Sequence, residues 1–329
     1  MYTIRMSKKK MKICVLFGGK SAEHDVSLVS ARNVINALDK TKYLVTPIKI
    51  NRNGKFNLNS IKGFDLVFPV LHGPYGEDGS MQGFLKLVGV PFVGPSILGS
   101  AVGMDKDVMK RLLRDNNIPI GDFLVFNNGD KLSFLEAKSR LGIPLFIKPA
   151  NLGSSVGIHK VKNEKEWIAA LKDAFLYDSK IVIEEFIAGR EIECSVLGNE
   201  NPIASIPGEI IANEEFYSYD AKYKGAGSTA IIPAKLDKKT IEKIKNMSVS
   251  VFKTLACEGM GRVDFFLKEN GDILVNDINT LPGFTAISMY PKLWEASGLS
   301  LVKLLDKLIN LGLQRFKREQ KLKSTIHEK

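Results

Sequence analysis

The stretch GRVDFFLKENGDILVNDIN constrains the fold of this chain more than any other part of its sequence. An Asn-Gly pair between two apolar runs predicts a β-hairpin closed by a two-residue type I′ turn, which fixes the register of the two strands. That register pairs Asp264 with Asp277 and Arg262 with Asn279. Because side chains alternate between the faces of a strand, these four are expected on one face of the sheet.

Two carboxylates in directly opposed positions repel each other unless a cation lies between them. Asp264, Asp277 and Asn279 offer hard oxygen ligands, which suit Mg²⁺ held together with substrate phosphates. The hairpin therefore predicts a metal site. The spacing leaves one alternative open, a plain polar face in water on which Arg262 neutralises the acids.

Alternation of apolar strands with amphipathic helices predicts an α/β fold whose first sheet is parallel. In the first unit we expect strands at residues 12–17, 42–50 and 65–70 and a helix at 26–38. Ligands of parallel sheets bind beyond the carboxyl ends of the strands. In this chain a glycine pair and the loop HGPYGEDG follow two of those ends.

Two further units follow along the chain. The second is expected to hold a helix, a strand, a glycine-rich loop, a helix and a strand, at 106–116, 145–149, 151–157, 164–175 and 181–185. The third is expected to hold a strand, a polar loop, a helix, the hairpin and a closing helix, at 191–197, 212–229, 238–255, 262–279 and 299–313. Polar loops as long as 212–229 are usually functional lids or disordered segments.

The net charge of +11 is concentrated at the two ends of the chain. Residues 1–11 form a basic extension and residues 314–329 a basic tail. Basic tails are more often solvated ends than binding elements, so we expect no nucleic-acid partner. Salt-sensitive binding of nucleic acid, lost on trimming both ends, would indicate a side activity.

No apolar run is long enough for a membrane span or a signal sequence, so we expect a cytoplasmic protein with no membrane partner. The three cysteines show no metal-ligand spacing and are expected to be reduced and buried.

A glycine-rich loop, GSSVG, follows the strand that carries Lys148. Backbone N–H groups of small residues can approach an anion closely, and Lys148 adds positive charge. A plain flexible turn explains the loop equally well. His72 has no second histidine near it in sequence, which favours a structural or hydrogen-bonding role over metal ligation.

Seven motifs in chain order carry a family resemblance: FGGKSAEHDVS, VLHGPYGEDGSMQG, MDKDVMK, FIKPANLGSSVGI, FYSYDAKY, GRVDFF and NDINTLPGFTAISMYP. Together they resemble the D-alanine–D-alanine ligases over residues 12–313. The resemblance implies a three-domain ATP-grasp architecture with a Rossmann-like N-terminal domain. The implied divisions are a substrate-binding domain over 1–104, a central ATP-grasp subdomain over 105–189 and a metal-binding ATP-grasp subdomain over 190–329.

The resemblance implies that ATP activates one D-alanine as D-alanyl phosphate, which a second D-alanine converts to D-alanyl-D-alanine for peptidoglycan. It also implies two Mg²⁺ ions, with Mn²⁺ as a substitute, and a homodimer. The implied ATP contacts are Lys106 and Lys148 at the phosphates, Glu184, Glu185 and Ile187 at adenine, Glu191 at ribose and Lys222 at the γ-phosphate. The implied metal ligands are Asp264, Asp277 and Asn279.

Substrate and catalytic residues follow from the same motifs. By resemblance, Glu23 holds the ammonium of the first D-alanine, with His72 close by, and Ser288 binds the second carboxylate. A lock of hydrogen bonds joins Glu23, Ser154 and Tyr223, and the last two are the candidate base. Arg262 and the N–H of Gly283 form the implied oxyanion hole.

Two other classes of function stay open. Related ligases join D-alanine to D-serine or D-lactate, and these commonly place Arg where this chain has Met289, so Met289 resembles the D-alanine type. A non-catalytic protein that binds nucleotides or nucleic acids would explain the basic ends. It would not explain the opposed carboxylates together with the lysines and Arg262.

The family usually has Glu where this chain has Asp277, whose side chain is one methylene shorter. We therefore expect Asp277→Glu to lower the Mg²⁺ concentration that gives half-maximal activity. A titration of activity with Mg²⁺ checks this, and an unchanged midpoint would contradict it.

Overall fold

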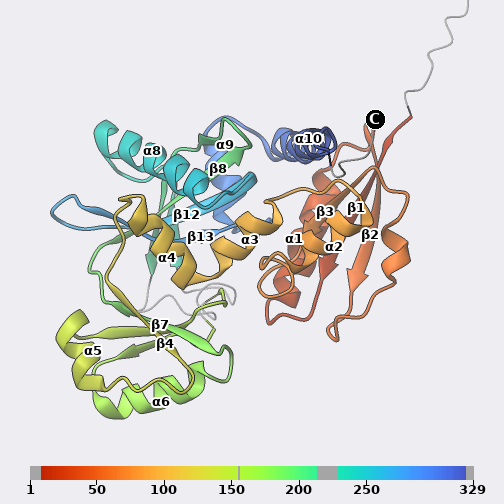
Figure 1. Cartoon of the computed structure of the whole chain (residues 1–329). Coiled ribbons are helices and arrows are strands. Elements are labelled where there is room, and N and C mark those ends of the chain that lie inside the picture. The colour runs from red at the N-terminus through yellow and green to blue at the C-terminus, as the bar shows by residue number, and fades with distance from the viewer. Residues whose placement is uncertain (1–8, 155, 213–227, 324–329) are drawn as a thin grey trace, which may run out of the picture.

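The computed structural model describes residues 9–154, 156–212 and 228–323. The described strands form three sheets, each with its own helices (Figure 1). These sheets, with the helices and loops beside them, carry the charged side chains described below, so their arrangement determines which residues meet.

The first sheet is parallel, as the sequence predicts, with the order β2-β1-β3. Its elements are β1 (Met11–Gly18), α1 (His24–Ala37), β2 (Tyr43–Ile50), the short 3₁₀ helix η1 (Leu58–Ile61), β3 (Leu66–Val70) and α2 (Ser80–Val88). The last helix of the chain, α10 (Leu301–Glu319), packs on this sheet (Figure 1). Leu304 and Leu308 share one core with Ile13 and Phe68.

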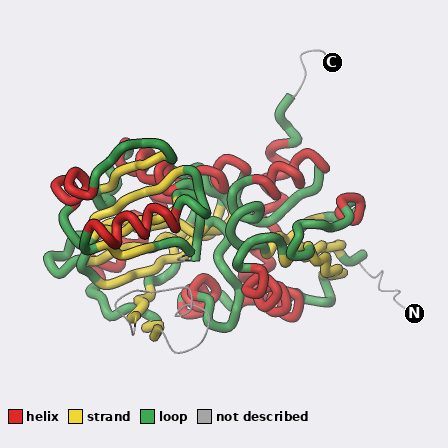
Figure 2. Tube along the Cα trace, turned by 90° about the horizontal axis from the view of Figure 1, so that it is seen from below, coloured by secondary structure: helices red, strands yellow, loops and turns green. Residues whose placement is uncertain are grey.

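The central sheet is antiparallel, with the order β4-β7-β5-β6. Its elements are β4 (Phe123–Asn127), α5 (Phe134–Leu141), β5 (Leu145–Pro149), β6 (His159–Val161), α6 (Glu164–Ala174) and β7 (Lys180–Glu185). Helices α5 and α6 cover the face that points away from the rest of the molecule, in front of the strands in the view from below (Figures 1 and 2). The opposite face of this sheet lines the cavity described below.

The third sheet has the order β11-β10-β8-β12-β13, with β9 beside β8, and its strands run antiparallel. The strands are β8 (Arg190–Gly198), β9 (Ile203–Ala204), β10 (Gly208–Ala212), β11 (Ser228–Ile231), β12 (Gly259–Leu267) and β13 (Ile273–Asn279). Its helices are α3 (Ile97–Met104), α4 (Lys106–Asp115), α8 (Lys238–Thr254) and α9 (Met289–Ala296). Met109 and Leu113 of α4 share a core with Phe252 of α8.

The sequence analysis found the strands and helices with strong periodicity but missed several short elements. Those missed are η1, α2, α3, β4, α5, β6, β9, β10, β11 and α9. The long loop expected over 212–229 is wrong at its ends, because β10 and β11 pair with each other there. Residues 213–227 of that loop lie outside the described part of the chain.

The closing helix expected over 299–313 extends into the basic tail, because α10 continues to Glu319. Arg315 is buried, donates to the carbonyls of Phe92 (2.8 Å) and Gly94, and stacks on the Phe92 ring at 4.3 Å. Arg318 binds Glu258 at 2.5 Å. These contacts attach the last helix to the body of the protein.

Among the described residues, no helix has both the length and the apolar character needed to cross a membrane.

Two helical glycines give a matched test of how tightly α10 packs. A Cβ at Gly312 would lie 2.6 Å from the backbone oxygen of Phe92, whereas one at Gly83 of α2 would have a nearest neighbour at 3.9 Å. We expect Gly312→Ala to destabilise the fold by about 1–3 kcal/mol through overpacking. Gly83→Ala is expected to stabilise it by about 0.5–1 kcal/mol. Thermal unfolding measures both, and equal shifts in one direction would contradict this packing.

Candidate active site

The β12–β13 hairpin pairs Asp264 with Asp277 and Arg262 with Asn279, which confirms the predicted register at these positions. All four line cavities on one side of the third sheet. The opposed carboxylates inferred from the sequence are therefore a property of the fold.

The turn of this hairpin is not the predicted two-residue type I′ turn. The N–H of Gly271 donates to the carbonyl of Lys268 (3.0 Å), and the N–H of Lys268 donates to Asp272 (2.9 Å), so three residues span the turn. Gly271 has a φ of 86° but Asn270 does not have a positive φ, which type I′ requires. A bulge at Asn276 then restores the predicted pairing further along the strands.

A third carboxylate extends this row, because Glu193 of β8 lies opposite Asp264 on the other side of β12. Arg262 donates from Nε and Nη2 to the two carboxylate oxygens of Asp264, at 2.7 Å each, and its Nε is 2.9 Å from Glu193 Oε2. At the other end, Lys106 Nζ lies 3.7 Å from Asp277 Oδ2. Two cations from different elements thus face the row.

The residues proposed for metal binding suit a hard cation in their chemistry, since they supply two carboxylates and an amide oxygen. Asn279 Nδ2 lies 3.4 Å from Asp264 Oδ2, so the three side chains are neighbours. Within the described ranges, no group of three or more His, Cys, Asp and Glu is arranged to hold a metal. A cation bound at Asp264 would share that carboxylate with Arg262. The structure thus also shows the contact expected from the alternative, in which Arg262 neutralises the acids.

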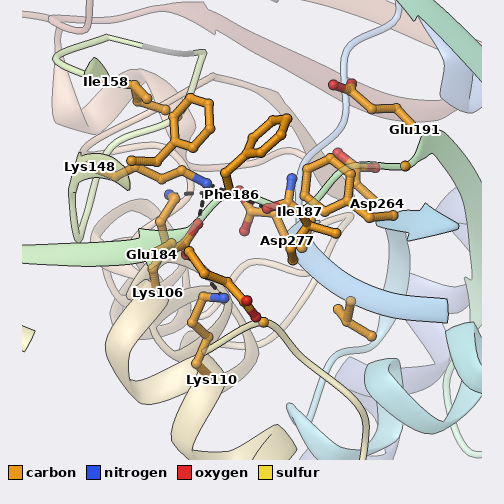
Figure 3. A pocket seen from close by; sticks show the side chains of 18 of the residues that line it. Lys106, Lys110, Lys148, Ile158, Glu184, Phe186, Ile187, Glu191, Asp264 and Asp277 are labelled. Carbon is orange, nitrogen blue, oxygen red and sulfur yellow. Dashed lines mark hydrogen bonds and ion pairs between the residues drawn. The ribbon is translucent and has the colours of Figure 1, made fainter. Parts of the chain in front are cut away.

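A cavity of about 320 Å³ lies between the central and third sheets (Figure 3). The ATP residues expected within the described chain line it: Lys106, Lys148, Glu184, Glu185, Ile187 and Glu191. The three expected metal ligands line it too. The cavity therefore brings together lysines, carboxylates and apolar side chains from positions between residues 106 and 279.

Strand alternation explains why Lys148 and Glu184 face this cavity. Leu145 and Ile147 of β5 point into the core under α5 and α6, so Lys148 points the other way. Lys148 pairs with Val182 of β7 and is therefore the diagonal neighbour of Glu184. Its Nζ lies 2.5 Å from Glu184 Oε2.

Several buried charges lie at the end of the cavity that holds Lys106 and Lys148. Lys110, one turn beyond Lys106 on α4, lies 3.1 Å from Glu184 Oε1. Lys106 Nζ donates to the carbonyl of Leu152 (2.6 Å). Burial opposes ionisation of Glu184, but Lys110 and Lys148 outweigh it and lower the pKa of this carboxyl to about 2.

Beside Glu185 and Glu191, the rest of the cavity has an apolar lining that suits a planar ring system. Its apolar lining comes from Phe146, Ile158, Phe186, Ile187, Phe266 and Val275. A Cβ at Gly121 would lie 2.6 Å from Ile187, so only glycine leaves Ile187 in place. Glu185 accepts from the N–H of Asp122 (2.8 Å), which fixes the edge of the strand beside the ring site.

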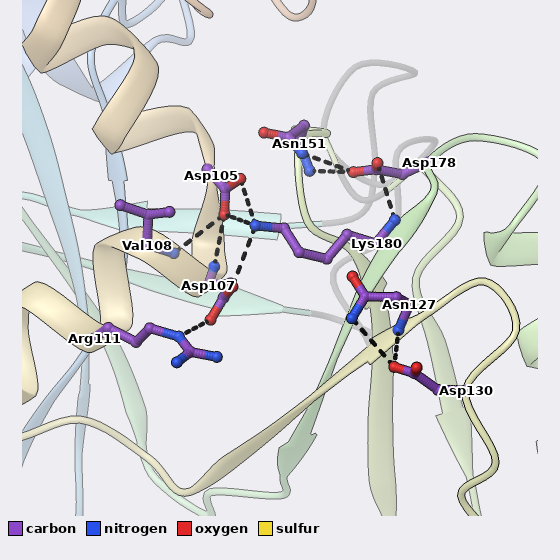
Figure 4. Close-up of polar contacts among 9 residues, drawn as sticks. All are labelled: Asp105, Asp107, Val108, Arg111, Asn127, Asp130, Asn151, Asp178 and Lys180. Atoms are coloured by element: carbon purple, nitrogen blue, oxygen red, sulfur yellow. Dashed lines mark hydrogen bonds and ion pairs between the residues drawn. The ribbon is translucent and has the colours of Figure 1, made fainter.

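A network of charges fixes the start of α4, which carries Lys106 (Figure 4). Asp105 caps the helix by accepting from the N–H groups of Asp107 and Val108, both at 3.1 Å. Lys180 of the central sheet lies 2.7 Å from Asp105 and 3.2 Å from Asp107. The helix that borders the third sheet is thus tied to the central sheet.

A second cavity of about 110 Å³ adjoins the first. The expected substrate residues line it: Glu23, His72, Gly283, Ser288 and Met289. Arg262 lines it as well, while Ser154 and Asn279 line both cavities. Groups bound in the two cavities would therefore meet at these shared residues.

Glu23 connects the first unit to the glycine loop of the central one. Ser154, whose φ is 52°, donates its hydroxyl to Glu23 Oε1. Ser21 accepts from the N–H of Glu23 (3.2 Å) and donates to the carbonyl of His72 (2.6 Å). Two hydrogen bonds of the first unit thus place Glu23 where the loop after β5 can reach it.

His72 is buried, and one of its contacts shows which ring nitrogen carries a proton. Nδ1 lies 3.1 Å from the carbonyl of Leu281, which only accepts, so Nδ1 carries a proton. Nε2 lies 3.4 Å from the Ser30 hydroxyl. Burial opposes a charge on the ring, but the carboxylates of Glu77 and Glu23 raise the pKa of His72. The residue is a hydrogen-bonding histidine, as the sequence favoured.

The far wall of this cavity follows β13. A Cβ at Gly283 would lie 2.8 Å from Ser288 Oγ, so the backbone approaches that hydroxyl closely. Ser288 Oγ accepts from the N–H of Thr285 (2.9 Å). Met289 is 5% exposed and packs with Ile210 and Leu293.

Lys222 and Tyr223 lie outside the described residues. The sequence analysis missed Lys110 and Glu193, although each had a signal. Lys110 is four residues from Lys106 and so shares its helix face, and Glu193 is two residues from Glu191 and so shares its strand face. Glu77 lies beside His72, only five residues away in sequence, whereas Ser30 reaches the site through contacts distant in sequence.

Two family descriptions match the chain. "D-ala D-ala ligase N-terminus" matches residues 12–64 and 57–95, and "D-ala D-ala ligase C-terminus" matches residues 112–310. The D-alanine–D-alanine ligase of Oceanobacillus iheyensis is 46% identical, over 96% of this chain and 99% of its own length.

Solved structures give the same picture. The D-alanine–D-alanine ligase from Coxiella burnetii matches with a TM-score of 0.86 and 38% identity, over 95% of this chain and 97% of its own. The VanG D-Ala:D-Ser ligase from Enterococcus faecalis matches with a TM-score of 0.84 and 37% identity, over 92% of this chain and 100% of its own. The ATP complex of the Bacillus anthracis D-alanine–D-alanine ligase matches with a TM-score of 0.82 and 34% identity, over 94% of this chain and 99% of its own.

The lowered pKa of Glu184 predicts a pH dependence of stability. Because its folded pKa of about 2 lies below the ordinary 4.5, the ionised carboxylate stabilises the fold above pH 4.5, and this is lost as pH falls toward 2. We expect the difference in Tm between wild type and Glu184→Gln to shrink over that range. Melting curves from neutral to acid pH measure it, and a constant difference would refute the assignment.

Proposed function

Because this chain belongs to the D-alanine–D-alanine ligase family, we propose that it joins two D-alanine molecules with cleavage of ATP to ADP and phosphate. The product is D-alanyl-D-alanine for peptidoglycan synthesis. The observation that carries the proposal is the pair of adjoining cavities. One is lined by lysines, carboxylates and an apolar slot, the other by Glu23 and Arg262, and the two share Ser154 and Asn279.

In the first step, the carboxylate of the first D-alanine attacks the γ-phosphorus of ATP, which gives D-alanyl phosphate and ADP. Lys106 and Lys148 bind the phosphates and offset their charge, which is the main requirement of phosphoryl transfer. Two Mg²⁺ ions, held by Asp264, Asp277 and Asn279, would supply further neutralisation of the phosphate oxygens. Lys222 would add a charge at the γ-phosphate.

Glu23 is a buried carboxylate that can pair with the ammonium group of a substrate. Its side chain is 8% exposed, and Ser154 donates to one of its oxygens. The hydroxyl of Ser154 thus holds Glu23 beside the glycine loop, where it accepts the ammonium of the first D-alanine with His72 close by. Tyr223 would complete the lock from the segment outside the described residues.

In the second step, the amine of the second D-alanine attacks the acyl carbonyl, and phosphate leaves. Arg262 and the N–H of Gly283 stabilise the oxyanion of the tetrahedral intermediate. Ser288 binds the carboxylate of this substrate. The attacking amine must lose a proton, and the Ser154–Tyr223 pair is the proposed base.

Other parts of the proposal concern the whole molecule. We place the reaction in the cytoplasm, where the three free, buried cysteines would stay reduced. We assign domains to residues 1–104, 105–189 and 190–329 and expect a homodimer, which light scattering after gel filtration would test.

The reaction is tested by phosphate release and product mass. We expect phosphate and the mass of D-alanyl-D-alanine from ATP, Mg²⁺ and D-alanine, and neither from L-alanine. D-serine and D-lactate, each with D-alanine, are the comparison substrates. Product only with one of these would overturn the assigned specificity, and no product with any would overturn the activity.

Met289 tests the choice of second substrate. We expect Met289→Arg to raise the ratio of D-serine to D-alanine use, because a polar group beside the pocket favours the hydroxyl. Met289→Leu keeps the apolar contact with Ile210 and Leu293 and is the matched control. Competition between the two amino acids gives the ratio, and an equal ratio in both variants would contradict the role of Met289.

A further inference from the structure

Three buried charges stand together in the larger cavity, where Lys148 is an expected phosphate contact and Glu184 an expected adenine contact. Glu184 is 6% exposed and lies between Lys148, at 2.5 Å, and Lys110, at 3.1 Å (Figure 3). Each lysine meets a different carboxylate oxygen. The sequence analysis gives roles to Glu184 and Lys148, and the proposed mechanism uses Lys148, but neither gives Lys110 a role.

Lys110 is held rigidly and away from solvent. It is 2% exposed, and its Nζ lies 5.5 Å from the centre of the Phe123 ring. Its neighbours Met109 and Leu113 on α4 are packed in the core of the third sheet. A buried lysine of this kind is costly unless a carboxylate pairs with it, and Glu184 is that carboxylate.

Lys110 changes the net charge of this cluster. With two ammonium groups and one carboxylate, the cluster carries one net positive charge toward the cavity. Without Lys110, Glu184 and Lys148 would form a neutral pair at 2.5 Å, and the attraction between Lys148 and a phosphate would be largely cancelled. The charge of Lys148 is available to a ligand only if another cation satisfies Glu184.

We propose that Lys110 is a positioning residue that neutralises Glu184 and thereby leaves the charge of Lys148 available to the phosphates of the nucleotide. Lys110 acts through Glu184 and does not itself contact the phosphates. The inference deepens the proposed function and rests on it for the identity of the nucleotide. The low pKa of Glu184 agrees with a carboxylate shared by two cations.

The experiment compares dissociation constants for ADP and adenosine, measured by calorimetry on the full chain. Their ratio isolates phosphate binding, because any effect of a variant on the adenine site cancels. Lys110→Met is expected to weaken the binding of ADP relative to the binding of adenosine by roughly tenfold or more. Lys110→Arg, which keeps the charge, is expected to restore much of the ratio.

The double variant Lys110→Met/Glu184→Gln is the decisive one. It removes one charge of each sign and restores a net positive charge at Lys148, so we expect the ADP-to-adenosine ratio to return toward wild type. Glu184→Gln alone should favour ADP further. A purely structural role for Lys110 predicts instead that the double variant is no better than Lys110→Met, and that result would overturn the proposal.

Arg114→Met is the matched control, since Arg114 is an exposed cation on the same helix at 5.6 Å from the same Phe123 ring. Its removal should leave the ratio unchanged, and a loss equal to that of Lys110→Met would reduce the effect to net charge. An unchanged ratio in Lys110→Met would also contradict the proposal. Because nucleotide binding is read directly, failure of the ligase assay with wild type would be a separate result.

Discussion

Repulsion within one row of carboxylates is the constraint on which the site depends. Glu193, Asp264 and Asp277 lie side by side across three neighbouring strands, where like charges destabilise a sheet. The row is tolerable because Arg262 spans two of the acids and Lys106 faces the third. The cations must therefore be held in place as firmly as the acids.

That requirement explains how the units are tied together. Lys106 projects from α4, whose first turn is capped by Asp105 and bound by Lys180 of the central sheet. The same helix buries Met109 in the core of the third sheet. At the far end of the chain, α10 packs on the first sheet, so that unit is also attached to the others.

The sequence predicted much of the site because its signals are local. The Asn-Gly pair located the hairpin, but Asp264 faces Asp277 as predicted only because the bulge at Asn276 offsets the three-residue turn. The motif order was enough to identify the family. Lys110 was missed because its partner, Glu184, comes from a strand more than seventy residues later along the chain. The short helices and edge strands were missed because their few residues carry too little periodicity to distinguish them from loops.

The hairpin has a consequence for comparing chains of different length. Its three-residue turn and the bulge at Asn276 each shift the pairing by one residue, and the shifts cancel before Asp277. A deletion within the loop at 269–271 would shorten the turn but leave Leu267 paired with Ile273, so Asp277 would still face Asp264. The turn can therefore differ in length between homologues without displacing this acid, and a single gap placed at the turn keeps Asp277 aligned with its counterparts.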